Sequence, residues 1–265
     1  MNITLTLHPS KLESAPHIAL IHGMGSASTI WKGIAPALER LFEVITFDLP
    51  GHGKTPYDSG QAMDPASLAD LVVANMDSLD IQKAHGVGNS LGGWVGLEIA
   101  SRHPSRVLTF IGLAPAGLIL TPYTKINPIT AQSRQIAVFT HSIQKYLLRF
   151  MWAKRIGFAS SSPKWRELPY EYALDAALAM GLSKGYFPAW NAMLYRRFDT
   201  PIDSSIPLTV VFGDSDHTLP ASTWQERTLV PPHTRWIVLP RCGHAPQWDC
   251  PEDVVRIICE TAAQR

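Results

Sequence analysis

The sequence is poor in cysteine and in charge, and it has no long apolar run. Its only cysteines, Cys242, Cys250 and Cys259, are odd in number and form no C-x-x-C pair, which argues against a disulfide framework or a zinc site. No stretch reaches the ~18 consecutive apolar residues of a membrane span, and the opening M-N-I-T-L-T-L-H does not resemble a secretion signal. We therefore expect free thiols and a cytoplasmic protein without a membrane span.

A large charge of either sign is also missing. Lys plus Arg is 23 and Asp plus Glu is 22, which leaves a net charge of +1, so nucleic acid is not an expected partner. Hydrophobic residues make up 46% of the chain and charged residues 17%, a composition typical of a globular protein with a sizeable core. The sequence makes no prediction about the oligomeric state.

Short apolar runs alternate with segments of helical period over most of the chain. The runs are 18–21, 44–47, the approach to Gly88, 108–113, 208–212 and 236–239. This alternation predicts an α/β fold with a mostly parallel central sheet flanked by helices.

Helix signals lie between these runs. Apolar residues at helical spacing predict a helix over 30–41 with Ser28 as its N-cap, and Asp64 with Pro65 predicts the start of another helix. We expect the last helix to begin near Pro251 and to bury Val254 and Ile258.

The alternation stops over residues 121–205. This segment holds 14 of the 24 aromatic residues and has 11 Lys or Arg against five Asp or Glu. Strands resume after it with the same buried character, so we expect a helical cap rather than a second independent domain. The predicted organisation is a core of 1–120 and 206–265 with the cap inserted after the sixth strand.

Residues 88–92 read G-N-S-L-G, a G-x-S-x-G motif between an apolar run and a helical pattern. Glycines on both sides of Ser90 allow a sharp turn that holds its hydroxyl at the apex. The helix N-terminus that follows presents free N–H groups to negative charge on a substrate oxygen. The motif therefore makes Ser90 a candidate nucleophile.

A serine nucleophile needs a base and an acid that orients the base. His244 follows the last apolar run in L-P-R-C-G-H-A-P, and Asp216 follows the preceding one in F-G-D-S-D-H. Both lie just beyond the predicted carboxyl end of a strand, where open α/β sheets place their sites. Asp214 in the same loop is an alternative acid.

Four pieces of the chain resemble the α/β-hydrolase fold superfamily, among its lidded, esterase-like members. In order, they are H-G-M-G-S-A-S-T-I-W (22–31), D-L-P-G-H-G (48–53), G-N-S-L-G-G-W (88–94), and the late pair F-G-D-S-D with G-H-A-P-Q-W-D-C-P-E. The resemblance implies that Ser90 is the nucleophile, His244 the base and Asp216 the acid, since the G-x-x-D spacing of the family selects Asp216 over Asp214.

The same resemblance assigns the oxyanion hole to the backbone N–H groups of Met24 and Leu91. It implies no metal and no organic cofactor. His22, within the oxyanion loop, is expected to brace that loop rather than to transfer protons.

A dinucleotide oxidoreductase is the first competing hypothesis, because G-M-G-S-A-S follows a predicted strand. Ser28 replaces its third glycine, and that reading leaves the serine motif and the late acid–base pair unexplained. A P-loop at G-K-T (53–55) fails because Asp48 occupies the position of the first glycine.

The prediction is a serine hydrolase that cleaves a small or medium carboxylic ester through an acyl-enzyme. The aromatic cap predicts a small-molecule substrate with an apolar portion, and its net +6 permits a negative group on it. Two alternatives stay open. The same triad also serves carbon–carbon bond hydrolysis, perhydrolysis or lyase chemistry in this superfamily, and a receptor can keep the scaffold without the chemistry.

Overall fold

A seven-stranded sheet forms the centre of the molecule, with strand order β1-β3-β2-β4-β5-β6-β7. The computed structural model describes residues 1–265, apart from the side chain of residue 129. Only β1 runs antiparallel to its neighbour, and the other pairs are parallel. The strands are β1 Thr4–His8, β2 His17–Ile21, β3 Glu43–Asp48, β4 Ala84–Asn89, β5 Val107–Leu113, β6 Leu208–Gly213 and β7 Arg235–Leu239. The predicted α/β fold with a mostly parallel sheet is confirmed.

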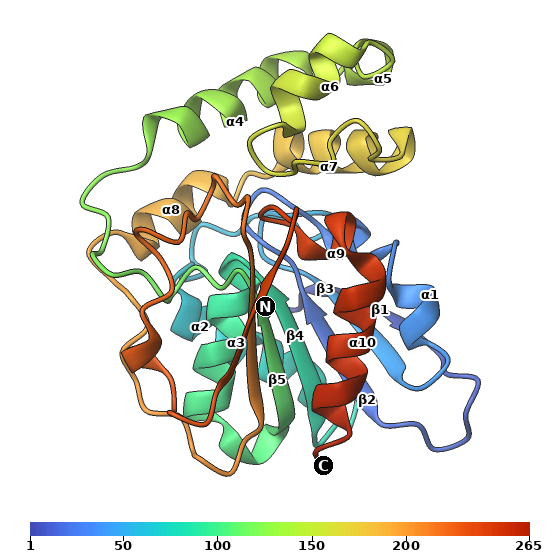
Figure 1. Cartoon of the computed structure of the whole chain (residues 1–265), viewed down its shortest axis with the longest axis vertical. Helices are drawn as coiled ribbons and strands as arrows, with labels where there is room; N and C mark the ends of the chain where they lie inside the picture. The colour runs from blue at the N-terminus through green and yellow to red at the C-terminus, as the bar shows by residue number, and fades with distance from the viewer.

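Helices cover both faces of this sheet (Figure 1). One core cluster packs α2 (Pro65–Asp77) and α3 (Leu91–Arg102) against the sheet. A second cluster packs the 3₁₀ helix η1 (Ser28–Trp31), α1 (Ala35–Leu38) and α10 (Pro251–Ala262) against the other face. The short elements η2 (Pro104–Arg106), η3 (Arg227–Leu229) and α9 (Pro246–Asp249) complete the core.

Two of the predicted helix starts are confirmed, and one helix is different. The Asp64 carboxylate accepts a hydrogen bond from the Ser67 N–H at 3.1 Å and caps α2, and Pro251 begins α10. The single helix predicted over 30–41 is wrong. Pro36 cannot donate the hydrogen bond that would continue a helix from η1, so a separate short helix, α1, forms around it, and Ser28 lies inside η1 with Ala27 as the cap.

Five helices lie between β5 and β6, and the described part of residues 114–207 contains no strand. They are α4 Pro128–Thr140, α5 Gln144–Leu147, α6 Met151–Phe158, α7 Tyr170–Leu182 and α8 Tyr186–Met193. We call them the inserted helices. They follow the fifth strand, so their predicted place after the sixth strand is wrong.

The strand register sets the carboxyl ends of the parallel strands side by side. Ile21 pairs with Gly88, Asn89 pairs with Leu113, and Gly213 pairs with Leu239. The loops that follow β2, β4, β6 and β7 therefore begin at one edge of the sheet, below the inserted helices (Figure 1). Every candidate site residue lies in one of these loops or at the first residue of α3.

Candidate functional site

Ser90 occupies a sharp turn between β4 and α3. Its backbone has φ 56° and ψ −116°, a positive φ that is rare for a residue with a side chain. The turn is fixed on both sides, because the Ser90 N–H donates to the Leu113 carbonyl at 3.0 Å and the Ser90 carbonyl accepts from Ala116 N–H at 2.9 Å. The half-buried side chain thus projects from a strained, well-braced position.

The glycines of the motif are required by close backbone contacts. A Cβ atom on Gly88 would lie 2.1 Å from the Gly92 carbonyl oxygen, and one on Gly92 would lie 2.1 Å from the Ile21 carbonyl oxygen. Both obstacles are main-chain atoms that cannot move aside by a rotamer change. Only glycine lets α3 start this close to the ends of β2 and β4.

His244 and Asp216 come together at the ends of β7 and β6. The His244 Nδ1 lies 2.9 Å from Asp216 Oδ2. The other oxygen, Asp216 Oδ1, accepts the N–H groups of Thr218 and Leu219, each at 2.8 Å. The Asp216 side chain is 1% exposed and that of His244 is 14% exposed, so the pair is held in a fixed geometry with little solvent around it.

These contacts keep Asp216 ionised. Burial alone would raise the pKa of Asp216, but the nearby His244 ring and the two N–H donors together lower that pKa below its ordinary value. A carboxylate in this position accepts a hydrogen bond from the protonated Nδ1 of a neutral His244 ring. The lone pair of the other ring nitrogen, Nε2, is then available to act as a base.

Asp214, the alternative acid, is not placed against His244. Its side chain is exposed, and its Oδ1 accepts from the Ser215 hydroxyl at 2.7 Å and the Cys242 N–H at 3.4 Å.

Cys242 is itself fully buried, and burial raises the pKa of its thiol far above the ordinary range. A thiol in this state is a packed side chain and not a nucleophile.

Asn89, which the sequence reasoning did not single out, joins the serine turn to the histidine loop. Its side-chain amide donates to the carbonyls of Leu113 and His244, both at 3.0 Å, and its oxygen accepts from Gln247 at 3.2 Å. Its place beside the nucleophile at a strand end is the signal that could have identified it.

The hydrogen bonds of the described residues do not include one between Ser90 and His244, so their direct contact stays a prediction.

The loop after β2 lies beside Ser90. A Cβ on Gly23 would stand 3.0 Å from the Ser90 Cβ. His22 braces this loop, because its Nδ1 donates to the Gly23 carbonyl at 2.7 Å and its Nε2 accepts from the Leu49 N–H at 3.0 Å. The Leu49 donor requires the neutral ring, and burial lowers the pKa of His22 accordingly.

Two backbone N–H groups beside Ser90 are left free. Neither Met24 nor Leu91 donates its N–H to an acceptor among the described residues. Leu91 is the first residue of α3, where helix geometry leaves N–H groups without partners and the helix dipole is positive. The two groups are therefore available to an oxygen that carries negative charge.

The inserted helices and a loop between two of them touch both sides of this arrangement. Met180 of α7 and Tyr186 of α8 lie against Gly25, where a Cβ would be 2.7 Å and 3.0 Å from their side chains. On the other side, the Ser161 carbonyl accepts the His244 N–H at 2.7 Å. The inserted segment thus covers the loop after β2 and supports the loop that carries His244.

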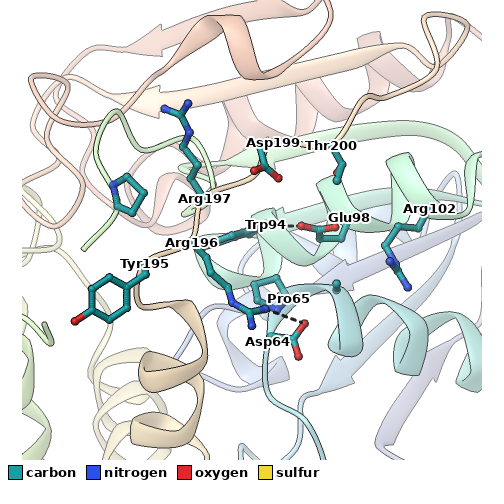
Figure 2. Close-up of a pocket in the computed structure, with 12 residues that line it drawn as sticks. Asp64, Pro65, Trp94, Glu98, Arg102, Tyr195, Arg196, Arg197, Asp199 and Thr200 are labelled. Carbon is teal, nitrogen blue, oxygen red and sulfur yellow. Dashed lines mark hydrogen bonds and ion pairs between the residues drawn. The ribbon is translucent and has the colours of Figure 1, made fainter. Parts of the chain in front are cut away.

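A cavity of about 390 Å³ lies elsewhere, between the start of α2, one side of α3 from Trp94 to Arg102, and residues 195–200 (Figure 2). Trp94 donates its Nε1 to Glu98 at 3.0 Å, and burial raises the pKa of Glu98. Arg196 faces Asp64 across the same hollow at 3.9 Å. Neither Ser90 nor His244 lines this cavity, so it is separate from the candidate site.

Within the described residues, no group of three or more His, Cys, Asp or Glu side chains is arranged to hold a metal ion. The three cysteines are free.

Comparison with known proteins gives a consistent picture. The model of the alpha/beta hydrolase family matches residues 18–257. The chain is 29% identical to the dihydrolipoyllysine-residue acetyltransferase component of the acetoin cleaving system of Pseudomonas putida, over 91% of this chain but only 62% of that one. It is 31% identical to a pimeloyl-acyl-carrier-protein methyl ester esterase of Aromatoleum aromaticum, over 92% of this chain and 96% of that one. The fold is similar to that of a thermophilic esterase from Thermogutta terrifontis, with a TM-score of 0.74, 21% identity, and coverage of 99% of this chain and 94% of that one.

Proposed function

Because the chain belongs to the alpha/beta hydrolase family, we propose that it is a serine hydrolase of small or medium carboxylic esters, with Ser90, His244 and Asp216 as its catalytic triad. The observation that carries the proposal is the 2.9 Å contact of His244 with the buried Asp216, in a loop tied by Asn89 to the serine turn. A base oriented by a carboxylate beside a strained serine is the arrangement that acyl transfer requires.

In the proposed reaction, the Ser90 hydroxyl attacks the ester carbonyl while His244 Nε2 accepts its proton. Asp216 stabilises the imidazolium that forms. The tetrahedral oxyanion accepts hydrogen bonds from the Met24 and Leu91 N–H groups, and the loss of one such donor costs about 3 kcal/mol of transition-state stabilisation.

Collapse of this intermediate breaks the bond to the alcohol, which leaves with the proton from His244. Water, deprotonated by the same imidazole, then attacks the acyl-enzyme and releases the acid. Two half-reactions with one shared base restore the free Ser90 hydroxyl.

The proposed substrate has an apolar acyl portion. Met180 and Tyr186 bring a thioether and an aromatic ring against the loop of Met24, and sites of this kind bind apolar groups. In this proposal residues 121–205 act as the cap over the site. The relative in Aromatoleum aromaticum is named as a methyl ester esterase, which supports an ester as the bond cleaved.

A fluorophosphonate probe tests the proposal directly. We expect it to label the native protein at Ser90 and to leave Ser90→Ala unlabelled, since only an activated serine reacts with such a probe. A series of p-nitrophenyl esters of increasing chain length then measures the acyl preference. Absence of labelling in a folded native sample would favour the receptor alternative, and labelling without turnover of any ester would favour another reaction of the same triad.

A further inference from the structure

The outermost layer of the inserted helices presents an unusual surface. Helices α4, α5 and α6 lie on the far side of α7 from the sheet (Figure 1), and each of them contacts α7. We call the exposed side chains of residues 136–156 the outer cap surface. Its large apolar members are Ile136, Val138, Phe139, Ile143, Tyr146, Phe150, Met151, Trp152 and Ile156.

These large apolar side chains are unusually exposed to solvent. Phe139 is 83% exposed, Ile156 66% and Trp152 57%. Large exposed apolar patches on soluble domains mark interaction surfaces. Phe150 and Trp152 also stack on each other, with ring centroids 6.3 Å apart.

The exposed apolar residues follow the helix period and point away from the molecule. Ile136 and Phe139 are three positions apart on α4, whereas Ala137 on the same helix is buried. Trp152 and Ile156 are four positions apart on α6, whose buried side includes Phe158. Because the buried sides pack toward α7, the exposed sides form the outer boundary of the insert.

The charge of this layer has one sign. Residues 99–166 contain no Asp or Glu, whereas residues 121–166 alone contain eight Lys or Arg. Among the described residues, none of these eight forms an ion pair. Lys145, Arg149 and Arg155 are exposed within the outer cap surface itself.

The two buried cations of this layer have structural partners. Arg134 donates to the carbonyls of Gly181 and Ser183 at the end of α7, at 3.2 and 2.9 Å, and cations stabilise helix C-termini. Lys154 donates to the carbonyls of Arg166 and Leu168. The exposed side chains of Lys145, Arg149 and Arg155 donate to no backbone carbonyl among the described residues; Lys145 Nζ lies 5.0 Å from the centroid of the exposed Tyr146 ring, within the same surface.

We propose that the outer cap surface docks on an anionic lipid surface. Apolar and aromatic side chains enter the boundary between headgroups and acyl chains, and surrounding Lys and Arg bind anionic headgroups. A second copy of the chain is disfavoured as the occupant, since two surfaces that carry only positive charge would repel each other. No helix of the described chain is long and apolar enough to span a bilayer, so the contact is peripheral.

Vesicle flotation with the full chain tests the proposal. We expect binding to phosphatidylcholine vesicles that contain roughly 30% phosphatidylglycerol, little binding to pure phosphatidylcholine, and weaker binding as salt rises above about 0.1 M. The proposal is independent of the proposed ester hydrolysis, because binding needs no turnover. Ser90→Ala should bind as the native protein does.

Two pairs of variants locate the contact. Arg149→Gln with Arg155→Gln should weaken binding to the anionic vesicles by roughly fivefold for each charge removed, and Phe139→Ser should weaken it with the charges intact. The matched controls are Arg40→Gln and Leu7→Ser, which replace an exposed cation and an exposed apolar residue of the sheet domain, outside the inserted helices. Both controls should bind as the native protein does.

Several outcomes would overturn the proposal. They are no binding to anionic vesicles at low salt, equal binding to neutral vesicles, and equal losses in the control and test variants. A dimer in analytical ultracentrifugation that Phe139→Ser abolishes, without vesicle binding by the native protein, would instead assign the surface to a second copy.

Discussion

Replacement of Asp216 by asparagine is the sharpest test of the proposed triad, because the structure shows what the new amide would do. Asp216 Oδ1 accepts two backbone N–H groups at 2.8 Å, and Oδ2 faces His244 Nδ1 at 2.9 Å. In Asp216→Asn the amide oxygen keeps the two N–H donors, so the NH₂ group turns toward His244. Two donors then face each other unless the imidazole moves its proton to Nε2.

This tautomer cannot accept the Ser90 proton. In serine enzymes the loss of the orienting carboxylate lowers kcat by about 10⁴-fold, which corresponds to about 5 kcal/mol in the activation barrier. The side chain is nearly isosteric and keeps its backbone bonds. We therefore expect a large kinetic effect with a nearly normal fold.

The measurement is kcat for p-nitrophenyl ester hydrolysis at neutral pH, with circular dichroism as a check on the fold. Asp214→Asn is the matched control in the same loop, and it should keep most of the activity because its exposed carboxylate does not contact His244. An inactive Asp214→Asn beside an active Asp216→Asn would refute the assignment of the acid. A folded Asp216→Asn with native kcat would refute the role of His244 as an oriented base.

Two further predictions concern stability. Gly92→Ala should destabilise the fold by at least about 3 kcal/mol, since its Cβ would lie 2.1 Å from the Ile21 carbonyl oxygen. The control Gly157→Ala meets nothing within 4 Å and should stabilise α6; equal melting temperatures for the two variants would contradict this reasoning. Burial and the neighbouring His22 ring lower the pKa of His52 to about 3. Below pH 6.5 His52 is therefore protonated in the unfolded chain but stays neutral in the folded chain. The free energy of unfolding falls as pH decreases from 6.5 toward 3. The free energy of unfolding in urea should differ between pH 7 and pH 5 by about 2 kcal/mol less in His52→Asn than in the native protein; an unaltered difference in His52→Asn would contradict the assigned cause.

Local signals in the sequence predicted local structure well. The Asp64–Pro65 pair marks a helix start because capping involves only the next few residues, and Asp64 accepts from Ser67. The G-N-S-L-G motif predicts a tight turn because its glycines relieve contacts within that turn and with the adjacent strand. The helix predicted over 30–41 is wrong because Pro36 interrupts the helical hydrogen bonds, although the apolar spacing on both sides of it is helical.

Contacts between distant parts of the chain could be predicted only in part. The Asp216–His244 pair was predicted from strand ends and resemblance, and the structure places the two side chains in contact. The bonds of Asn89 to the His244 carbonyl and of the Ser161 carbonyl to the His244 N–H join residues far apart in sequence. Such hydrogen bonds use an amide side chain or the main chain, so no sequence motif predicts them.

Two of the main-chain hydrogen bonds that join the inserted segment to the sheet domain lie in the loops on either side of α7. The Ser161 carbonyl bonds the His244 N–H at 2.7 Å, and the Gly185 N–H bonds the Gly51 carbonyl at 3.1 Å. Both hydrogen bonds lie outside residues 128–158, which contain α4, α5 and α6. A chimera that exchanges only 128–158 for the equivalent part of a relative would keep both hydrogen bonds, whereas a chimera that exchanges the whole insert would have to rebuild the backbone support of the proposed base.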